Sequence, residues 1–421
     1  MTSVRTFMQF AVQNDFEIHQ LDVKSAYLNA DIDCEIYMVQ PEGYCEPGKE
    51  NMVCKLHKSL YGLKQSGRNW NCMLNNSLIT FGCKKSDGDS CVYVIVTNDK
   101  LDGMILIWVD DILIATAHKK LLKRMKDHLK GKFKMKDMGK ISYFLGIKFV
   151  QSHSKIEMDQ SQYLMSILQK YGMSECKPRS TPSEPRASTT STDAAPLSEN
   201  PRVYRELVGS LLYATTCTRP DLSWVVSKLS QHLANPDLSD WVMLKHVLKY
   251  VKGTVNYKLC FTKSSDGLHI HGYSDSDWAS SSDRRSTTGY YFALNSSGPP
   301  VSWKSRKQPT VALSSCEAEY MALSASTQEA IYLTTVMNDY LLKSKPVIHS
   351  DSQSALSLIE NPINHNRTKH IDIRYHFVRE KYAAGTIDIL YAPRDENVAD
   401  IMTKAPSKQY LSNFHSVLFG N

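Results

Sequence analysis

The stretch that most constrains this chain is "ILIWVDDILIA", residues 105–115, in which two adjacent aspartates interrupt a run of apolar and β-branched side chains. Such flanks are typical of strands, so the stretch predicts a hairpin with Asp110 and Asp111 at its tip. Two carboxylates about 4 Å apart repel each other by roughly 4 kcal/mol at an effective dielectric constant near 20. The pair therefore needs either a divalent cation between its members or a turn that leaves one carboxylate in water.

A third aspartate extends this pattern. The sequence "FEIHQLDVKSAYLN" predicts a strand that reaches Asp22 and is followed by a turn. Three such carboxylates could hold the two divalent metals used in phosphoryl or nucleotidyl transfer. Alternatively, Asp22 caps a turn and the Asp110–Asp111 pair is a polar loop. Asp22 lies far from the pair in the sequence, so spacing alone does not decide between these alternatives.

Composition limits the class of protein. A chain of 421 residues, 42% hydrophobic and 22% charged, is typical of two or three globular domains. Its net charge of +7 favours a polyanionic partner. The ten cysteines include no C-x-x-C pair, which favours reduced thiols over a zinc site or disulfides. No signal peptide or membrane-spanning run is visible in the sequence, so we expect a soluble protein of the cytoplasm or nucleus without a membrane partner.

Two predicted helices carry lysine stripes beside their apolar faces, one in residues 118–133 and one in residues 239–254. A solvated helix surface would explain either stripe by itself. Two basic stripes together with the aspartate hairpin favour a nucleic-acid path, because phosphate contacts require such cations. The stripe residues are Lys119, Lys123, Lys126 and Lys130 in the first helix, and Lys245, Lys249 and Lys252 in the second.

Residues 178–201 are predicted to be a flexible linker. In this segment 14 of 24 residues are Ser, Thr or Pro, and Leu197 is its only large apolar residue. Such a segment buries too little surface to offset its ordering entropy. The sequence therefore predicts a division into residues 1–177 and 202–421.

Long stretches of the chain resemble the Pol polyprotein of copia-type retrotransposons. In order and spacing, "QLDVKSAYLNADIDCEIYMVQPEGY", "LHKSLYGLKQSGRNW", "ILIWVDDILIA" and "YFLGIKF" are similar to its reverse transcriptase. The stretches "YRELVGSLLYATTCTRPDLSWVVSKLSQHLANP" and "HGYSDSDWASSSDRRSTTGYYF" continue the resemblance into its RNase H half. Together they cover nearly the whole chain.

The resemblance implies an RNA-directed DNA polymerase in which Asp22, Asp110 and Asp111 are the palm ligands of two Mg2+ ions, with Mn2+ as an alternative. It implies that the hairpin centred on Gly146 grips the primer strand. It also implies that residues 59–70 lie under the template and the incoming nucleotide. The expected partners are an RNA template, a DNA primer, an RNA–DNA hybrid and deoxynucleoside triphosphates.

The chain departs from the family pattern at three places. Trp108 stands where the family has tyrosine, and residues 66–68 are Ser-Gly-Arg where Ala-Pro-Arg is common. The chain also opens shortly before Asp22, so we expect most of the finger strands to be missing. A chain without them is expected to extend primers weakly or not at all.

The second half shows the element order of RNase H: three strands, a long helix, then a strand and a helix, from "GLHIHGYSDSD" to "SQSALSLIE". Asp275, Glu319, Asp351 and Asp400 fall where a second pair of Mg2+ ions would be held. Such a site would direct water at a phosphodiester of RNA paired with DNA.

Neighbouring acidic residues compete for two of these positions. Glu317 and Glu319 are two residues apart on a helix and do not share a face. Glu319 is preferred because "EYMA" matches the family, and Asp275 is preferred over Asp277 by its position after "GYS".

The expected fold is therefore α/β (α+β), with a helical connection between two catalytic regions. The predicted regions are a palm and thumb-like part in residues 1–177 with its fingers largely missing, a linker in 178–201, a connection in 202–264 and an RNase H-like mixed sheet in 265–421. An integrase would order its carboxylates Asp, Asp, Glu and would lack a palm, which disfavours that class. A catalytically impaired remnant that only binds nucleic acid stays open as an alternative, and the sequence does not predict an oligomeric state. The expected location is the cytoplasm, within a virus-like particle, or the nucleus.

Overall fold

The computed structural model describes residues 1–184, 201–296, 298–360 and 372–420. The chain forms two compact units, one of residues Asn14–Ile141 and one that joins Met1–Gln13 to Ser142–Asn421. These boundaries differ from the predicted division at residues 178–201. Along the described ranges, no helix has both the length and the apolar character that crossing a bilayer requires.

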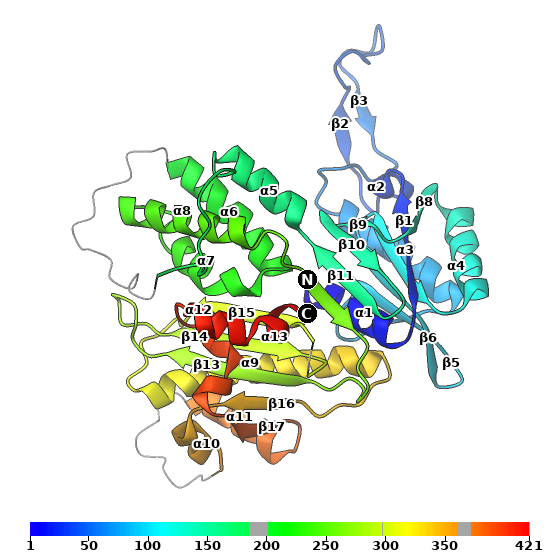
Figure 1. The fold of residues 1–421 in the computed structure, drawn as a ribbon. Coiled ribbons are helices and arrows are strands. Elements are labelled where there is room, and N and C mark those ends of the chain that lie inside the picture. The colour runs from blue at the N-terminus through cyan, green and yellow to red at the C-terminus, as the bar shows by residue number, and fades with distance from the viewer. Residues whose placement is uncertain (185–200, 297, 361–371, 421) are drawn as a thin grey trace. The chain divides into compact units, whose positions relative to one another are not determined.

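The unit of residues 14–141 is built on an antiparallel sheet with the strand order β4-β5-β6-β7-β1-β8 (Figure 1). Its strands are β1 (Glu17–Val23), β4 (Lys84–Lys85), β5 (Val92–Thr97), β6 (Lys100–Trp108), β7 (Asp111–Thr116) and β8 (Met135–Lys140). The predicted hairpin is confirmed, because β6 and β7 pair around a tip at residues 109–110. A separate ribbon is formed by β2 (Tyr37–Val39) and β3 (Val53–Lys55).

Two helices cover one face of this sheet and close its core. Apolar side chains of α3 (Ser66–Phe81) and α4 (Lys119–Lys132) pack on strand residues such as Leu21, Ile105 and Ile112. The short helix α2 (Ala26–Asn29) follows β1. The alternation of buried and exposed residues on α4 is the period expected of a helix with one apolar face.

The larger unit contains a four-stranded sheet that joins distant parts of the chain. Its order is β12-β11-β10-β9, from β9 (Tyr143–Phe144), β10 (Ile147–Gln151), β11 (Lys155–Asp159) and β12 (Leu259–Thr262). Because β12 pairs with β11, the chain after the predicted linker returns to the sheet formed before it. This pairing explains why the linker does not separate the compact units.

The first residues of the predicted linker lie along a helix. The Arg179 amide donates to the Lys249 carbonyl at 3.2 Å, and a ring nitrogen of His246 lies 3.0 Å from the Thr181 carbonyl. Both partners belong to α8 (Leu238–Gly253). The prediction of a flexible linker therefore does not apply to residues 178–184, and residues 185–200 lie outside the described part of the chain.

Five helices of this unit accompany the four-stranded sheet: α1 (Thr2–Gln13), α5 (Ser161–Lys170), α6 (Pro201–Cys217), α7 (Ser223–Ser230) and α8. A capping box starts α8, because Asp237 and Asp240 each accept a hydrogen bond from the other's backbone amide. The predicted helical connection thus corresponds to α6, α7 and α8, including the second lysine-bearing helix.

The C-terminal part is a mixed sheet of the predicted RNase H-like kind, ordered β15-β14-β13-β16-β17 (Figure 1). Its strands are β13 (His271–Asp277), β14 (Thr287–Ala293), β15 (Ser302–Lys307), β16 (Val347–Ser350) and β17 (Asp388–Tyr391). The first three pair antiparallel, whereas β13, β16 and β17 run parallel. The expected α/β fold class is confirmed, whereas β17, the helix before it and the short helical elements after it were not predicted.

Helices complete this sheet: α9 (Ser315–Asp339), α10 (Gln353–Glu360), α11 (Asp372–Ala383), α12 (Lys408–Asn413), α13 (His415–Phe419) and the 3-10 turn η5 (Val398–Met402). The long helix α9 packs against β13 and β14.

A buried ion pair holds α8 to the turn before α7. Arg219 donates two hydrogen bonds to Asp221, at 2.9 and 2.7 Å, and both side chains are fully buried. The Tyr250 hydroxyl of α8 donates to the same carboxylate at 2.8 Å. Removal of one partner would leave a buried charge uncompensated.

We therefore expect Arg219→Ala to lower the free energy of unfolding of this unit by about 3–5 kcal/mol. The control Arg202→Ala removes an exposed pair with Glu206 and should cost at most about 0.5 kcal/mol. Thermal melting of both variants measures the difference. Similar melting temperatures for the two variants would contradict the assigned role of the buried pair.

Candidate functional site

The structure brings Asp22 next to the hairpin aspartates. Asp22 on β1 lies directly opposite Asp111 on β7 in the antiparallel register. Side chains at such positions share a face of the sheet, with Cβ atoms about 4.5–5.5 Å apart. The backbone of Val23 donates to the Asp110 carbonyl at 2.9 Å, so the end of β1 also holds the hairpin tip.

The tip of this hairpin is strained and anchored. Val109 has a φ of 55°, a left-handed conformation that β-branched residues rarely adopt. The indole nitrogen of Trp70, from α3, donates to the Val109 carbonyl at 2.6 Å. Trp70 is buried and packs edge-on against Phe133. This buried indole therefore fixes the turn that carries Asp110 and leads into Asp111.

The environment of Asp111 disfavours its negative charge. Burial is the main cause of a raised pKa of Asp111, and the charges of Asp110 and Asp22 raise it further. A hydrogen bond of 2.9 Å from the Gln20 side-chain amide acts in the opposite direction. The arrangement is suited to a divalent cation, which would remove the repulsion.

A second cluster forms on the RNase H-like sheet. Asp275 lies on β13, Glu319 on the N-terminal part of α9, and Asp351 directly after β16. One oxygen from each carboxylate lies within 4.8 Å of the other two. Within the described ranges, Asp22, Asp110 and Asp111 do not form another group this close.

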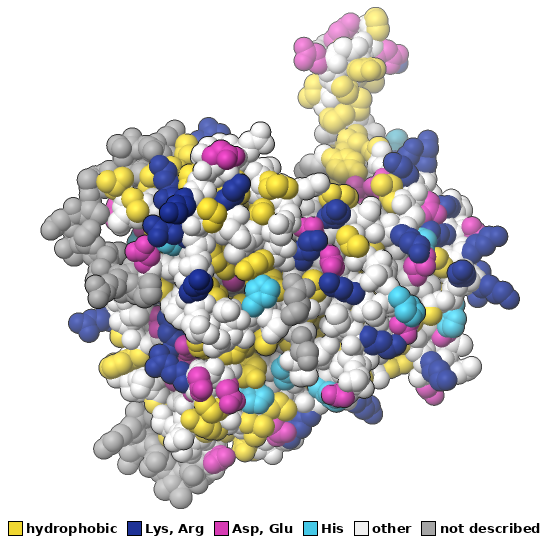
Figure 2. Space-filling model, in the orientation of Figure 1, with side chains coloured by type: hydrophobic (Ala, Val, Ile, Leu, Met, Phe, Trp, Pro, Cys, Tyr) yellow, Lys and Arg dark blue, Asp and Glu magenta, His cyan; other side chains and the backbone are white. Residues whose placement is uncertain are grey.

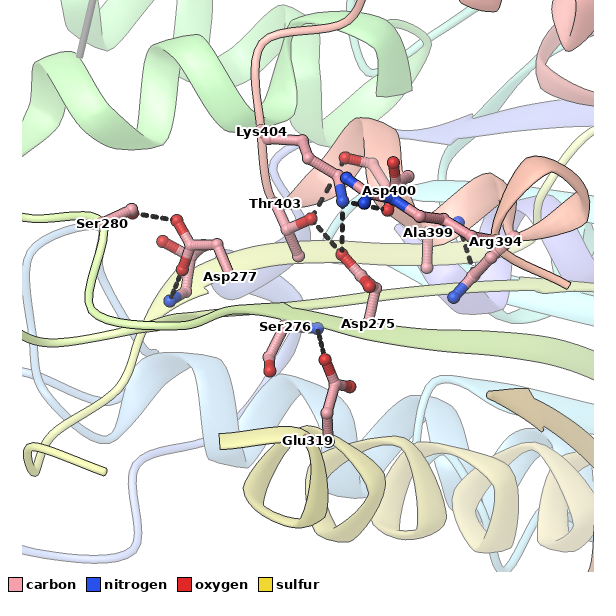
Figure 3. Close-up of polar contacts among 12 residues, drawn as sticks. Asp275, Ser276, Asp277, Ser280, Glu319, Arg394, Ala399, Asp400, Thr403 and Lys404 are labelled. Carbon is pink, nitrogen blue, oxygen red and sulfur yellow. Dashed lines mark hydrogen bonds and ion pairs between the residues drawn. The ribbon is translucent and has the colours of Figure 1, made fainter. Parts of the chain in front are cut away.

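The fourth predicted carboxylate, Asp400, reaches the cluster through a lysine (Figure 3). Lys404 forms an ion pair with Asp400, and its ammonium nitrogen lies 3.9 Å from Asp275 Oδ2. The Thr403 hydroxyl donates to the same Asp275 oxygen. Asp400 therefore joins Asp275 through Lys404 and is not one of the three carboxylates in mutual contact.

Asp275 is buried and its two partners are partly buried, and the acids of the cluster hold their protons more firmly than usual. Burial raises the pKa of Asp275 to about 7, against the attraction of Lys404. Burial and the charges of Asp275 and Asp351 raise the pKa of Glu319 well above its ordinary value. One Glu319 oxygen accepts from the Ser276 amide at 3.3 Å, and among the described residues its other oxygen, which is buried, has no hydrogen-bond partner. This unsatisfied oxygen and its carboxylate neighbours fit the ligand set of a hard divalent cation.

The two neighbouring acidic residues lie elsewhere. Glu317 accepts from the Leu313 amide at 2.7 Å and caps the start of α9 together with Ser314. Asp277 accepts from the Ser280 hydroxyl and the Thr287 amide, so it closes the turn between β13 and β14 (Figure 3). The structure thus places Glu319 and Asp275, rather than these neighbours, in the cluster.

A glycine allows the segment of Asp400 to approach the sheet. Gly289 lies opposite Asp275 on β14. A Cβ atom at residue 289 would lie 2.6 Å from Thr403 Cγ2 and 2.8 Å from Met402 Cβ. Any larger residue would displace the turn that brings Thr403 and Lys404 over Asp275.

The predicted lysine stripes have mixed surroundings. On α4, Lys126 and Lys130 donate to Asp137 at 2.9 and 2.8 Å, whereas Lys119 and Lys123 are exposed. Burial by itself would raise the pKa of Asp137, but the hydrogen bonds from Lys130 and Lys126 lower it below its ordinary value.

On α8, Lys245 is exposed and lies over the Trp241 ring, while Lys249 and Lys252 are half-buried. The stripes of α4 and α8 belong to different compact units.

The hairpin around Gly146 has the conformation that its sequence suggests. Leu145 and Gly146 both have positive φ, as a tight turn between paired strands requires. The Tyr213 hydroxyl of α6 donates to the Leu145 carbonyl. The Tyr213 side chain therefore anchors this turn within the larger unit.

Sequence analysis missed several residues that support the two sites. Trp70 and Gly289 lie in stretches that resemble the family, but each acts on the backbone of a distant segment, so the motifs gave no sign of these supporting roles. Thr403 and Lys404 follow Asp400 by three and four residues, a spacing that returns side chains to one side of a helical turn. That spacing was the available signal.

Comparisons with known proteins agree with the geometry. The family described as reverse transcriptase (RNA-dependent DNA polymerase) matches residues 1–185. The chain is 40% identical over 415 residues to the retrovirus-related Pol polyprotein from transposon TNT 1-94 of Nicotiana tabacum, covering 96% of this chain and 31% of that polyprotein. It is 32% identical to a putative transposon Ty5-1 protein of Saccharomyces cerevisiae, covering 73% of this chain and all of that protein. The chain thus spans about a third of the tobacco polyprotein.

A solved structure shares the fold. The foamy viral protease-reverse transcriptase, determined in complex with an RNA/DNA hybrid, superposes with a TM-score of 0.53 at 11% identity. The match covers 94% of this chain and 46% of the viral protein.

We expect Gly289→Ala to destabilise the larger unit by about 1–3 kcal/mol, because the new methyl group overlaps Thr403 and Met402. The matched control is Gly209→Ala in α6, where a Cβ meets no atom within 4 Å. That control should stabilise the helix by about 0.5–1 kcal/mol. Melting temperatures that move in the same direction for both variants would rule out the steric argument.

We expect Trp70→Phe to loosen the aspartate hairpin, because the ring is retained while the hydrogen bond to Val109 is lost. A loss of about 1 kcal/mol corresponds to roughly fivefold faster exchange of the tip amides. Hydrogen exchange measured on peptides covering residues 105–115 tests this. Trp108→Phe, at a side chain that is 53% exposed, is the control and should leave exchange unchanged. Equal exchange in both variants would show that Trp70 does not anchor the tip.

Proposed function

Because this chain belongs to the reverse transcriptase family of copia-type retrotransposon Pol polyproteins, we propose that it polymerises DNA on an RNA template and cleaves the RNA of RNA–DNA hybrids. The observation that carries the nuclease proposal is that one oxygen each of Asp275, Glu319 and Asp351 lie within 4.8 Å of one another, where α9 packs on an RNase H-like sheet. The observation that carries the polymerase proposal is the pairing of Asp22 with Asp111 beside Asp110.

In the nuclease site, the cluster and Asp400 would hold two Mg2+ ions, or Mn2+ in their place. Such ions supply Lewis acidity, which neutralises phosphate charge and activates the attacking water. The protein's own part is to hold the ligands. Thr403 fixes one oxygen of Asp275, the Ser276 amide fixes one oxygen of Glu319, and the second Glu319 oxygen stays available.

In the polymerase site, Asp22, Asp110 and Asp111 would hold Mg2+ for the incoming deoxynucleoside triphosphate and the primer end. Gln20 orients one oxygen of Asp111, and Trp70 holds the tip. The exposed Trp108 beside these carboxylates would offer an indole face to a base, where the family has a phenol.

Backbone contacts would come from cations and from the hairpin of Gly146. We assign template, primer or hybrid phosphates to the exposed Lys119 and Lys123 on α4. Lys126 and Lys130 would first have to leave Asp137, so their share is smaller. The other proposed contacts are Lys245, Lys249 and Lys252 on α8.

The hairpin of Gly146 presents the exposed side chains of Tyr143 and Lys148 and is the proposed contact for the primer strand.

We expect Asp351→Asn to lower the rate of magnesium-dependent cleavage of the RNA strand of a hybrid by about 100-fold or more, because the cluster loses one negative ligand. Hybrid binding should persist, since the lysines are untouched. Single-turnover cleavage of a labelled hybrid, together with binding in the absence of divalent ions, measures both effects.

The matched control is Asp388→Asn, an exposed carboxylate paired with Lys345, which should cleave at the wild-type rate. Equal rates for Asp351→Asn and the wild type would place the nuclease site elsewhere. Binding without cleavage by any variant would favour the nucleic-acid-binding remnant.

A further inference from the structure

A cavity of about 380 Å³ lies beside the nuclease cluster, between the connection helix α7 and the RNase H-like sheet. From α7 it is lined by Trp224 and Lys228, and from the sheet by Asp277. Thr403 and Lys404 also line it. All of these residues belong to the larger compact unit, in which α7 packs on β15 and η5.

This cavity adjoins the proposed site of cleavage. Thr403 donates to Asp275, and Lys404 pairs with Asp400, so the same two residues form part of the cluster and part of the cavity wall. Figure 3 shows Lys404 and Thr403 above Asp275, with Asp277 further along the same strand, β13. A strand whose phosphate lies at the carboxylates would therefore continue along the cavity.

The side chains that line the cavity are of the kinds that bind a nucleic-acid strand. Two ammonium groups, Lys228 and Lys404, line the cavity together with the carboxylate of Asp277, and Lys404 is also paired with Asp400. That carboxylate of Asp277 accepts hydrogen bonds from Ser280 and from the Thr287 amide, and it also attracts Lys228, so a bound phosphate would share this lysine with Asp277. The Lys228 nitrogen lies 5.4 Å from the centre of the Trp224 ring. A cation next to an aromatic face is the combination that binds a phosphate with its neighbouring base or sugar.

Lys228 is also an unusual surface lysine. It is half-buried at the wall of the cavity, and burial lowers its pKa against the attraction of Asp277 and Asp240. An ammonium group that has lost much of its water gains more from a phosphate than a fully hydrated one. Hydroxyl groups such as that of Ser281 line the same cavity and could pair with a ribose 2′-hydroxyl.

We propose that this cavity binds the RNA strand that is being cut, next to the scissile phosphate, and that Lys228 of the connection helix contacts a phosphate of that strand. The proposal rests on the proposed nuclease function and extends it, because it makes α7 part of the substrate site. Trp224 positions the lysine and contacts the adjoining sugar or base. An acidic peptide bound in the same cavity is the competing occupant.

The test is hybrid binding by the full chain carrying Asp351→Asn, without divalent ions, so that no cleavage occurs. Adding Lys228→Gln should weaken binding of an RNA–DNA hybrid by about 5- to 10-fold and reduce the slope of log affinity against log salt by about 1. Lys345→Gln removes the same charge from a pair with Asp388 and is the matched control. It should change affinity less than twofold, on the scale expected for an exposed pair.

A single neutral linkage locates the contact. Hybrids are prepared with one methylphosphonate, on a 2′-O-methyl ribose, at successive positions of the RNA strand or the DNA strand. For the Lys228 protein we expect one RNA linkage near the cut to weaken binding, and the same linkage to have no further effect in Lys228→Gln. Lys228→Arg keeps the charge and should bind like the parent protein, which separates lost contact from misfolding.

Equal affinities for Lys228→Gln and Lys345→Gln would overturn the proposal, as would a sensitive linkage confined to the DNA strand or an absence of hybrid binding. Displacement of an acidic peptide, with no linkage effect, would also overturn it. Loss of the RNA linkage effect in Lys228→Gln supports it even if the wild-type chain does not cleave, in which case the proposed nuclease activity fails and the binding site stands.

Discussion

Repulsion between buried carboxylates is the constraint that both candidate sites share. Each site gathers negative charge where burial already disfavours it, as the raised pKa values of Asp111 and Glu319 indicate. Such clusters persist because their backbones are held by strands whose hydrogen bonds are independent of the carboxylates. Each cluster also contains a group that stabilises its negative charge. In one site the Gln20 amide donates a hydrogen bond to Asp111, and in the other the Lys404 ammonium group lies near Asp275.

The supporting residues act by shape as much as by charge. Trp70 holds a strained turn through one hydrogen bond to a carbonyl, and Gly289 leaves the space into which residues 398–404 descend. Both decide where a carboxylate lies, and proposed chemistry of this kind depends on the positions of ligands within fractions of an ångström.

The architecture also assigns a broader role to the segment between the two sheets. Because β12 pairs with β11, the chain on either side of residues 185–200 belongs to one compact unit. Within that unit, α7 lies against β15 and η5 and contributes to the cavity beside the cluster. A helix predicted as a connection thus lies beside the proposed active site, where Lys228 lines the cavity.

The sequence by itself determined several elements: the hairpin of residues 105–115, the lysine-bearing helices and the order of strands and α9. These follow from local periodicity and from motif spacing, which are properties of neighbouring residues. Only the tertiary structure decided which distant residues meet. It paired Asp22 with Asp111, tied Lys126 and Lys130 to Asp137, joined Lys404 to Asp400, and moved the unit boundary away from the predicted linker. Periodicity fixes which way a side chain faces, whereas its partner across the sheet is set by strand register and packing between segments far apart in the chain.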